Sequence, residues 1–283
     1  MIWALVLTVV AADPSGLVAG DVVTIAEDYE FTEGPVWLRS GELVFSDIPA
    51  DTNYREDHSV FRKPSGKSNG LTLDVEGRLI ACEHWNRRVS RTEKDGSITV
   101  MAETFEGKKL NSPNDAIVRG DGTIYFTDPP YGLEGREPDL EFSGVYSIAP
   151  EGKISLLVKD FNRPNGIGLS PDQKTLYVSD VAKGHIRSFP VNDDGSIDEG
   201  KIHCEVQNPD GMAVDELGNI WTSSRQGIQV FGLEGEHLST IEFPQVPANC
   251  AFGGKDNSTL YVTARTGLYK IECNVKGLKP GAW

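Results

Sequence analysis

The chain has 283 residues, of which 39% are hydrophobic, and a formal net charge of −15 at pH 7. Because a chain of this length and composition can bury one large core or two ordinary ones, a disordered protein is excluded. The net negative charge would repel nucleic-acid phosphates and anionic lipid headgroups, and no block of Lys or Arg offsets it. We therefore expect neither nucleic acid nor a membrane as a partner.

The first segment, residues 1–12 (MIWALVLTVVAA), is apolar and too short to span a bilayer as a helix. Its end, Val10-Ala11-Ala12, resembles a signal-peptide cleavage site, although the basic n-region is missing. We expect a signal peptide and a periplasmic or secreted protein. An apolar strand at the start of a cytoplasmic protein is the alternative.

After a strand-like segment at 22–28 (VVTIAED), one pattern recurs six times along the chain. Each copy begins with a small polar or acidic residue, runs through an apolar strand, turns on Gly or Asp and continues through a second apolar strand. The copies are EGPVWLRSGELVFSD (33–47), NGLTLDVEGRLIAC (69–82), NDAIVRGDGTIYFTD (114–128), NGIGLSPDQKTLYVSD (165–180), DGMAVDELGNIWTSS (210–224) and NCAFGGKDNSTLYVTA (249–264).

A second pattern, two more strands around a Gly turn, falls between the copies. Its members are VFRKPSGKS (60–68), VSRTEKDGSITVMAE (89–103), VYSIAPEGKISLLVKD (145–160), IRSFPVNDDGSI (186–197) and IQVFGLEGEHLSTIEF (228–243). One repeat is therefore four antiparallel strands. The repeat length of roughly 40–50 residues is typical of one propeller blade.

These repeats predict an all-β fold, a six-bladed β-propeller with four antiparallel strands per blade, as a single domain over 17–283. The last blade has a third strand at 268–273 but lacks a fourth, so we expect 22–28 to supply it and close the ring. The alternative is two β-sandwiches with similar turns. The four cysteines show no CxxC spacing, which favours free thiols over a zinc site or a disulfide framework; they are Cys82, Cys204, Cys250 and Cys273.

The first residue of each copy is expected to face the channel, because the innermost strand of every blade lines the axis. The six residues share oxygen-bearing side chains: Glu33, Asn69, Asn114, Asn165, Asp210 and Asn249. Carboxylates buried together require a compensating cation or proton. Carboxylate and amide oxygens suit Ca2+ first, with Mg2+, Mn2+ or Zn2+ as alternatives. The alternative is that these residues only build tight turns before glycine.

Four segments resemble the signatures of the SMP-30/gluconolactonase/luciferin-regenerating enzyme family: FTEGPVW (31–37), LNSPNDAIV (110–118), RPNGIGLS (163–170) and PDGMAVD (209–215). The stretch 69–91 and FTDPPYG (126–132) are most similar to its bacterial gluconolactonase branch. The resemblance implies a six-bladed propeller, a channel calcium and hydrolysis of a lactone to a hydroxy acid. The metal ligands that it implies, matched position by position, are Glu33, Asn114, Asn165 and Asp210.

The resemblance also implies that Asp210 is the general base. A carboxylate bound to a dication is a weak base unless desolvation offsets the metal, so water made acidic by the same cation is the alternative source of the nucleophile. Asp115 is expected to support Asn114 and to relay a proton. The chain departs from the animal lactonases at Ser112, where they carry an arginine. By position, the expected substrate contacts are Asn69, His84, Asn249 and Asp115.

Other activities remain open at this point. Because the chain has no GxSxG elbow and no recognisable triad, metal-assisted hydrolysis is favoured. The same metal site could cleave phosphotriesters, or the protein could be a non-catalytic propeller that binds carbohydrate or protein while calcium stiffens the channel. A pure interaction scaffold is disfavoured by the acidic axis. Trp85, Tyr131 and Trp221 could line a pocket, although core packing is the favoured role for each.

Overall fold

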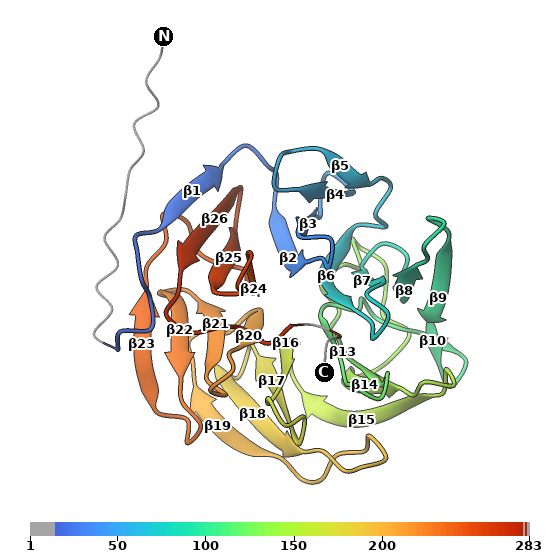
Figure 1. The fold of residues 1–283 in the computed structure, drawn as a ribbon. Helices are drawn as coiled ribbons and strands as arrows, with labels where there is room; N and C mark the ends of the chain where they lie inside the picture. The colour runs from blue at the N-terminus through green and yellow to red at the C-terminus, as the bar shows by residue number, and fades with distance from the viewer. Residues whose placement is uncertain (1–14, 280, 282–283) are drawn as a thin grey trace.

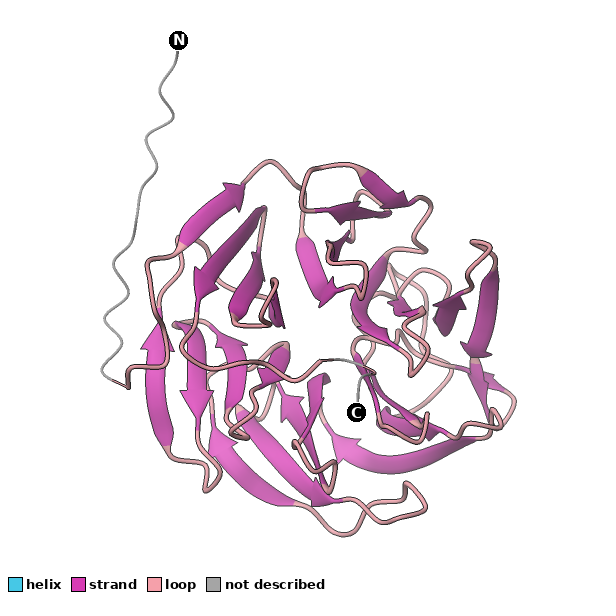
Figure 2. Cartoon of the chain, in the orientation of Figure 1, coloured by secondary structure: helices cyan, strands magenta, loops and turns pink. Residues whose placement is uncertain are grey.

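In a computed structural model, which describes residues 15–279 and 281, the chain forms six four-stranded antiparallel sheets around a central axis (Figure 1). Figure 2 shows that this part of the chain consists of strands and loops. The prediction of an all-β, six-bladed propeller is therefore confirmed. None of the described residues belongs to a helix long and apolar enough to cross a membrane. The apolar segment at 1–12 lies outside the described residues.

Blades 1 to 3 follow one another along the chain, and their strands run from the axis outward. They are β2 (Thr32–Trp37), β3 (Leu43–Asp47), β4 (Thr52–Arg55) and β5 (Val60–Arg62); β6 (Ser68–Leu73), β7 (Leu79–Glu83), β8 (Arg88–Thr92) and β9 (Ile98–Ala102); and β12 (Ala116–Val118), β13 (Ile124–Asp128), β14 (Ser143–Ile148) and β15 (Ile154–Phe161). A hairpin of β10 (Thr104–Phe105) and β11 (Lys108–Lys109) joins blades 2 and 3.

Blades 4 to 6 complete the ring. Their strands are β16 (Pro164–Leu169), β17 (Thr175–Asp180), β18 (His185–Pro190) and β19 (Lys201–Glu205); β20 (Met212–Val214), β21 (Ile220–Ser224), β22 (Gly227–Phe231) and β23 (His237–Ile241); and β24 (Asn249–Gly253), β25 (Thr259–Ala264), β26 (Gly267–Glu272) and β1 (Val23–Ala26). In the last blade β1 is the outer strand, with Val23 opposite Lys270. The segment 22–28 thus closes the ring as predicted.

The outer strands of two blades differ from the prediction. In blade 1 the third strand is β4, not part of 60–68, and residues 60–62 form the fourth. The strand β4 was not predicted because the polar Asn53 is typical of a loop. In the structure its amide is buried and donates to the hydroxyls of Ser46 (3.0 Å) and Ser68 (2.8 Å). In blade 4 the fourth strand lies at 201–205, beyond 186–197, because residues 191–198 form a hairpin of their own.

Each hydrophobic core lies between two neighbouring blades rather than within one. The largest, for example, combines Trp221 and Ile228 of blade 5 with Phe252 and Leu260 of blade 6. Burying one such side chain contributes about 1.5–3 kcal/mol. Because every blade shares its apolar faces with both neighbours, no blade can move without uncovering two cores.

The residues that end the second strand of a blade, Ser-Asp or Thr-Asp in three of the copies, tie the blades together near the channel. The Thr127 hydroxyl donates to the Asn165 carbonyl of the next blade at 2.7 Å, and the Ser179 hydroxyl donates to the Asp210 carbonyl at 3.0 Å. The adjoining carboxylate, Asp128, accepts from the backbone N–H groups of residues 111 and 112 at 2.8 and 2.7 Å. These bonds hold the chain that enters each innermost strand.

Asp128→Ala is expected to lower the free energy of unfolding by about 2 kcal/mol, because it leaves buried N–H groups without an acceptor. Equilibrium unfolding in urea measures the change. Asp95→Ala is the matched control: its carboxylate also accepts from a backbone N–H, but in an exposed turn, so its loss should stay near 0.5 kcal/mol. Equal losses in the two variants would contradict this role for Asp128.

Candidate functional site

The six leading residues lie where the innermost strands begin, at one mouth of the channel. Five of them are at most 5% exposed, and Asp210 is partly exposed. Their backbones are linked across blades: Gly70 N–H donates to the Asn114 carbonyl (2.7 Å), and Gly166 N–H donates to the Asp210 carbonyl (3.1 Å). The structure therefore brings these residues together around the axis.

The glycines that follow the leading residues are explained by this crowding. A Cβ on Gly211 would lie 2.0 Å from Asn249 Cγ, and one on Gly34 would lie 2.0 Å from the Asn69 carbonyl oxygen. Gly34 also has a φ of 45°, whereas Gly211 does not need a left-handed backbone. The alternative interpretation, in which a leading residue and its glycine only build a tight turn, thus fails at Asp210-Gly211. Glycine is needed there because Asn249 of the next blade packs against its Cα atom.

Three carboxyl groups lie near one another in this ring. Burial raises the pKa of Glu33 to about 7, although a hydrogen bond from its neighbour's N–H opposes the shift. Burial, followed by the charge of Glu33, raises the pKa of Asp115 to about 8. Burial, then the charges of Glu33 and Asp115, raise the pKa of Asp210 well above its ordinary value. Burial raises all three pKa values, and neighbouring carboxylates add to the shifts of Asp115 and Asp210.

Amide side chains surround these carboxyls and orient them. The amide of Asn165 lies near Asp210 and opposes the rise in the pKa of that carboxyl, and the amide of Asn249 does the same for Glu33 and Asp115. The Asn249 Oδ1 atom accepts from Cys250 N–H at 2.8 Å, which leaves its NH2 group free to donate elsewhere. The two amides partly offset the desolvation of the three acids.

His84 lies beside the ring, against Asn69. Its Nε2 atom is 3.4 Å from Asn69 Nδ2, and burial lowers the pKa of His84 to about 4, so the imidazole is neutral. The loop after β13 covers it: a Cβ on Gly132 would lie 2.4 Å from both His84 and the Ser112 hydroxyl. Arg136 fastens this loop by donating to the Trp85 carbonyl at 2.7 Å.

Ser112, which stands where the animal lactonases have an arginine, supports the same loop. Its hydroxyl accepts from Gly132 N–H at 2.9 Å.

The three aromatic residues that could line a pocket differ in their surroundings. Trp221 is buried in the core, and its indole N–H donates to Asp215 at 2.9 Å. Trp85 is 49% exposed beside Arg136, and Tyr131 lies near the ring, where burial raises its pKa although the Asn165 amide opposes the shift.

The arrangement provides oxygen atoms that have no protein partner. Asp210 Oδ1 and Asn69 Oδ1 are both buried, and neither accepts a hydrogen bond from the described residues. Within the same part of the chain, no three His, Cys, Asp or Glu side chains form a metal cluster by themselves. The predicted ligand set instead combines two carboxylates with amide oxygens, the donor chemistry that suits a hard cation.

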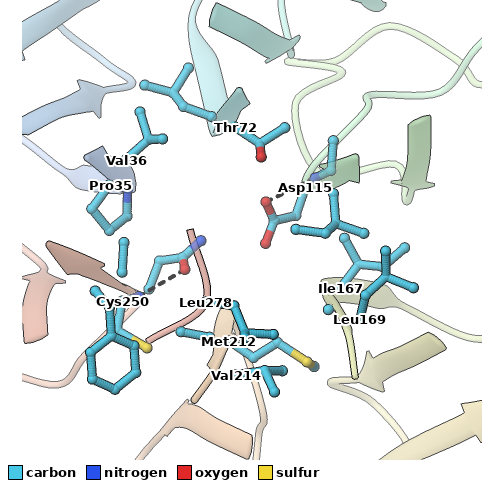
Figure 3. A pocket seen from close by; sticks show the side chains of 18 residues that line it. Pro35, Val36, Thr72, Asp115, Ile167, Leu169, Met212, Val214, Cys250 and Leu278 are labelled. Atoms are coloured by element: carbon cyan, nitrogen blue, oxygen red, sulfur yellow. Dashed lines mark hydrogen bonds between the residues drawn. The ribbon is translucent and has the colours of Figure 1, made fainter. Parts of the chain in front are cut away.

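Beyond the ring, further along the same strands, the channel widens into a cavity of about 80 Å3 (Figure 3). Its walls are mostly apolar, and Asp115, Asn249 and Leu278 are among the residues that line it. Leu278 belongs to the segment after β26, which crosses to this end of the channel, and its N–H donates to the Val214 carbonyl at 3.0 Å. The cavity has room for a few water molecules, and its walls suit neither a sugar nor a cation.

The chain is similar to one protein family over most of its length. The family model described as "SMP-30/Gluconolactonase/LRE-like region" matches residues 31–266. The chain belongs to the SMP-30/gluconolactonase/LRE-like family. The resemblance inferred from the sequence is therefore confirmed.

Individual relatives agree with this placement. The gluconolactonase of Zymomonas mobilis subsp. mobilis is 32% identical over 92% of this chain and 83% of that protein. The regucalcin of Bos taurus is 30% identical over 86% of each. The solved structure of a gluconolactonase from Xanthomonas campestris is 32% identical, with a TM-score of 0.85 over 94% of both chains.

Two arginines at the mouth were not identified from the sequence. Arg163 lies over the Tyr131 ring, and the charge of Arg265 lowers the pKa of Asp210, although burial and nearby carboxylates outweigh it. The signal for Arg163 was present, since it stands two residues before Asn165 as Ser112 stands two before Asn114. No comparable signal marks Arg265.

With a chelator present, the free energy of unfolding is expected to fall as pH rises from about 5 to about 8. Glu33 and Asp115 have native pKa values of about 7 and about 8, above the values of about 4 in an unfolded chain. Between the unfolded and native pKa values, the native state therefore binds more protons than the unfolded state. The stability that these protons contribute is lost as pH rises through the native pKa. Urea unfolding at several pH values measures the decline.

Asp115→Asn should make that decline shallower, because one of the carboxyls can no longer ionise. The exposed Asp193→Asn serves as control and should leave the decline as in the parent. Stability that stays constant or rises over this pH range would contradict the carboxyl cluster.

Proposed function

We propose that the protein is a lactonase that hydrolyses a sugar lactone such as gluconolactone to the aldonic acid, with help from a divalent cation. The observation that carries the proposal is the buried, partnerless Oδ1 of Asp210 within a ring of carboxyl and amide groups. Sequence similarity to two gluconolactonases over most of the chain supports the reaction class.

The residues present fit a cation. Glu33 and Asp210 repel each other in a buried place, and each carries a raised pKa that a positive charge would reverse. The ligands would be Glu33, Asn114, Asn165 and Asp210. Their hard oxygens favour Ca2+, with Mg2+, Mn2+ or Zn2+ as alternatives. A cation held there supplies Lewis acidity for the lactone carbonyl and acidifies water.

The chain's own groups provide proton transfer and orientation. Asp210 takes the proton of the attacking water at Oδ1, and the amide of Asn165, which lies near enough to oppose the rise in the pKa of Asp210, orients this carboxylate. Asn69 offers its unpartnered Oδ1 to a substrate hydroxyl, and the neutral His84 beside it is a second polar contact. Substrate enters from the mouth side of the ring, because the opposite side is the apolar cavity.

Hydrolysis of glucono-1,5-lactone, followed by acid release and corrected for spontaneous opening, is expected to stop when the protein is treated with a chelator. Activity should return with added Ca2+, because the cation both compensates the carboxyls and activates the carbonyl. The same addition should raise the melting temperature, since the ion binds only the folded ring. Full activity in the thoroughly chelated protein would refute the metal requirement.

Asp210→Asn is expected to lower kcat about a hundredfold to ten-thousandfold, because an amide can still ligate a cation but cannot accept a proton. Calorimetric titration with Ca2+ should show that binding persists, although more weakly. Asp193→Asn, on an exposed loop, makes the same chemical change and should leave kcat at the parent value. An Asp210→Asn variant with bound calcium and parental kcat would remove Asp210 from the role of base.

A further inference from the structure

Most arginines of the described chain are already engaged with the protein. Each of eight lies within 4.0 Å of an Asp or Glu oxygen: Arg55, Arg62, Arg78, Arg87, Arg88, Arg91, Arg119 and Arg187. Arg39 and Arg136 donate to backbone carbonyls. The other three, Arg163, Arg225 and Arg265, form no ion pair with a described residue.

These three arginines lie on the mouth side of blades 4, 5 and 6. Arg163 enters an innermost strand, and Arg225 and Arg265 stand in turns between second and third strands. Because the second strand runs antiparallel to the first, that turn returns to the end where the leading residue lies. All three are exposed to solvent. In a chain with a net charge of −15, these three arginines, which form no ion pair with a described residue, thus all lie on the mouth side.

Arg265 is fixed beside Asp210. Its backbone is in the left-handed region, with a φ of 51°, and its carbonyl accepts from Thr32 N–H at 2.7 Å. Its guanidinium carbon lies 5.7 Å from the centroid of the Phe31 ring. Its positive charge also lowers the pKa of Asp210, although burial and nearby carboxylates outweigh this effect. The guanidinium is therefore held by an aromatic ring and keeps its hydrogen-bond donors available for another group.

Arg163, at the entry to blade 4, is held in a similar way. Its backbone N–H donates to Asp180 at 3.1 Å, and its guanidinium carbon lies 5.1 Å from the Tyr131 centroid. Burial, followed by the charge of Asp210, raises the pKa of Tyr131, and the Asn165 amide opposes that shift, so this ring lies near both residues. Two guanidiniums, each placed against an aromatic ring, thus belong to the blades on either side of blade 5, which Asp210 begins.

A neutral sugar does not require this arrangement, since amide and hydroxyl groups serve its hydroxyls. An anionic substrate does, because the ring of carboxyls and the net charge would otherwise repel it. The fork of a guanidinium matches a carboxylate or a phosphate through two parallel hydrogen bonds. Arg163 and Arg265 supply such guanidinium groups at the mouth of the acidic site, in blades 4 and 6.

We propose that the lactone taken by this site carries an anionic group, a carboxylate or a phosphate monoester, that binds to Arg163 and Arg265 while its carbonyl faces the ring. This inference rests on the proposed lactonase function and specifies its substrate class. It assigns binding roles to two residues for which the sequence analysis had none.

The test compares kcat/KM for three lactones with the calcium-loaded protein: the neutral glucono-1,5-lactone, 6-phosphoglucono-1,5-lactone and glucaro-1,4-lactone, which has a free carboxylate. At least one anionic lactone should be preferred over the neutral one by about tenfold or more, the usual effect of a charge-assisted hydrogen bond. The preferred one identifies the anion as phosphate or carboxylate.

Arg163→Gln and Arg265→Gln should each reduce the ratio of anionic to neutral kcat/KM by about tenfold, mainly through KM. Arg225→Gln is the matched control, because it removes the same charge from the same side of the molecule without an aromatic support at the mouth. It should leave the ratio unchanged. Melting curves verify that all three variants are folded.

A ratio near one in the parent protein, or an equal loss in Arg225→Gln, would overturn the inference while leaving the lactonase proposal intact. If no lactone is hydrolysed, the lactonase proposal fails, and calorimetric titration with glucose 6-phosphate and glucose then tests the anion site directly. Binding of the phosphate ester alone, lost in Arg163→Gln and Arg265→Gln, supports the site. Equal or absent binding of both sugars refutes it.

Discussion

Repulsion among carboxyl groups around one buried axis is the constraint on which the rest of the structure depends. Glu33, Asp115 and Asp210 come from three different blades, and burial raises the pKa of each. A flexible scaffold would relieve such repulsion by moving the groups apart. The propeller prevents this, because each blade shares its apolar cores with both neighbours.

Closure of the ring makes that restraint complete. The strand β1 pairs with β26 although the two are far apart in sequence, so the last blade is made from both ends of the described chain. Hydroxyl groups at the ends of second strands, such as Thr127 and Ser179, then fix the backbone of the next leading residue. The result is a set of oxygen-bearing side chains whose positions are fixed by the fold itself.

The sequence predicted the repeated parts of this structure well. Apolar alternation and glycine turns predicted the two innermost strands of all six blades. The lack of a fourth strand in the last blade predicted that the ring closes with the strand at 22–28. The leading residues were found because a repeat places equivalent positions at the same end of the channel. The glycines that follow them had been open to two interpretations, and only the structure shows that Gly211 leaves room for Asn249.

Features that do not repeat were missed, each for a physical reason. The strand β4 contains Asn53, whose burial is satisfied by hydroxyls from other strands that no local pattern reveals. Arg163 stands at a recognisable position two residues before Asn165, but the aromatic rings that support Arg163 and Arg265 are seen only in the structure. Such contacts join different blades, so single-sequence periodicity carries no trace of them.

The central claim is that four of the leading residues form one cation site on the axis of the channel. Crystals grown without added metal and then soaked in Mn2+, which scatters anomalously and shares the preference for oxygen ligands, test it most directly. The account predicts a single strong anomalous peak among Glu33, Asn114, Asn165 and Asp210. A fully ordered channel without a peak there, or with the ion bound elsewhere, would contradict it.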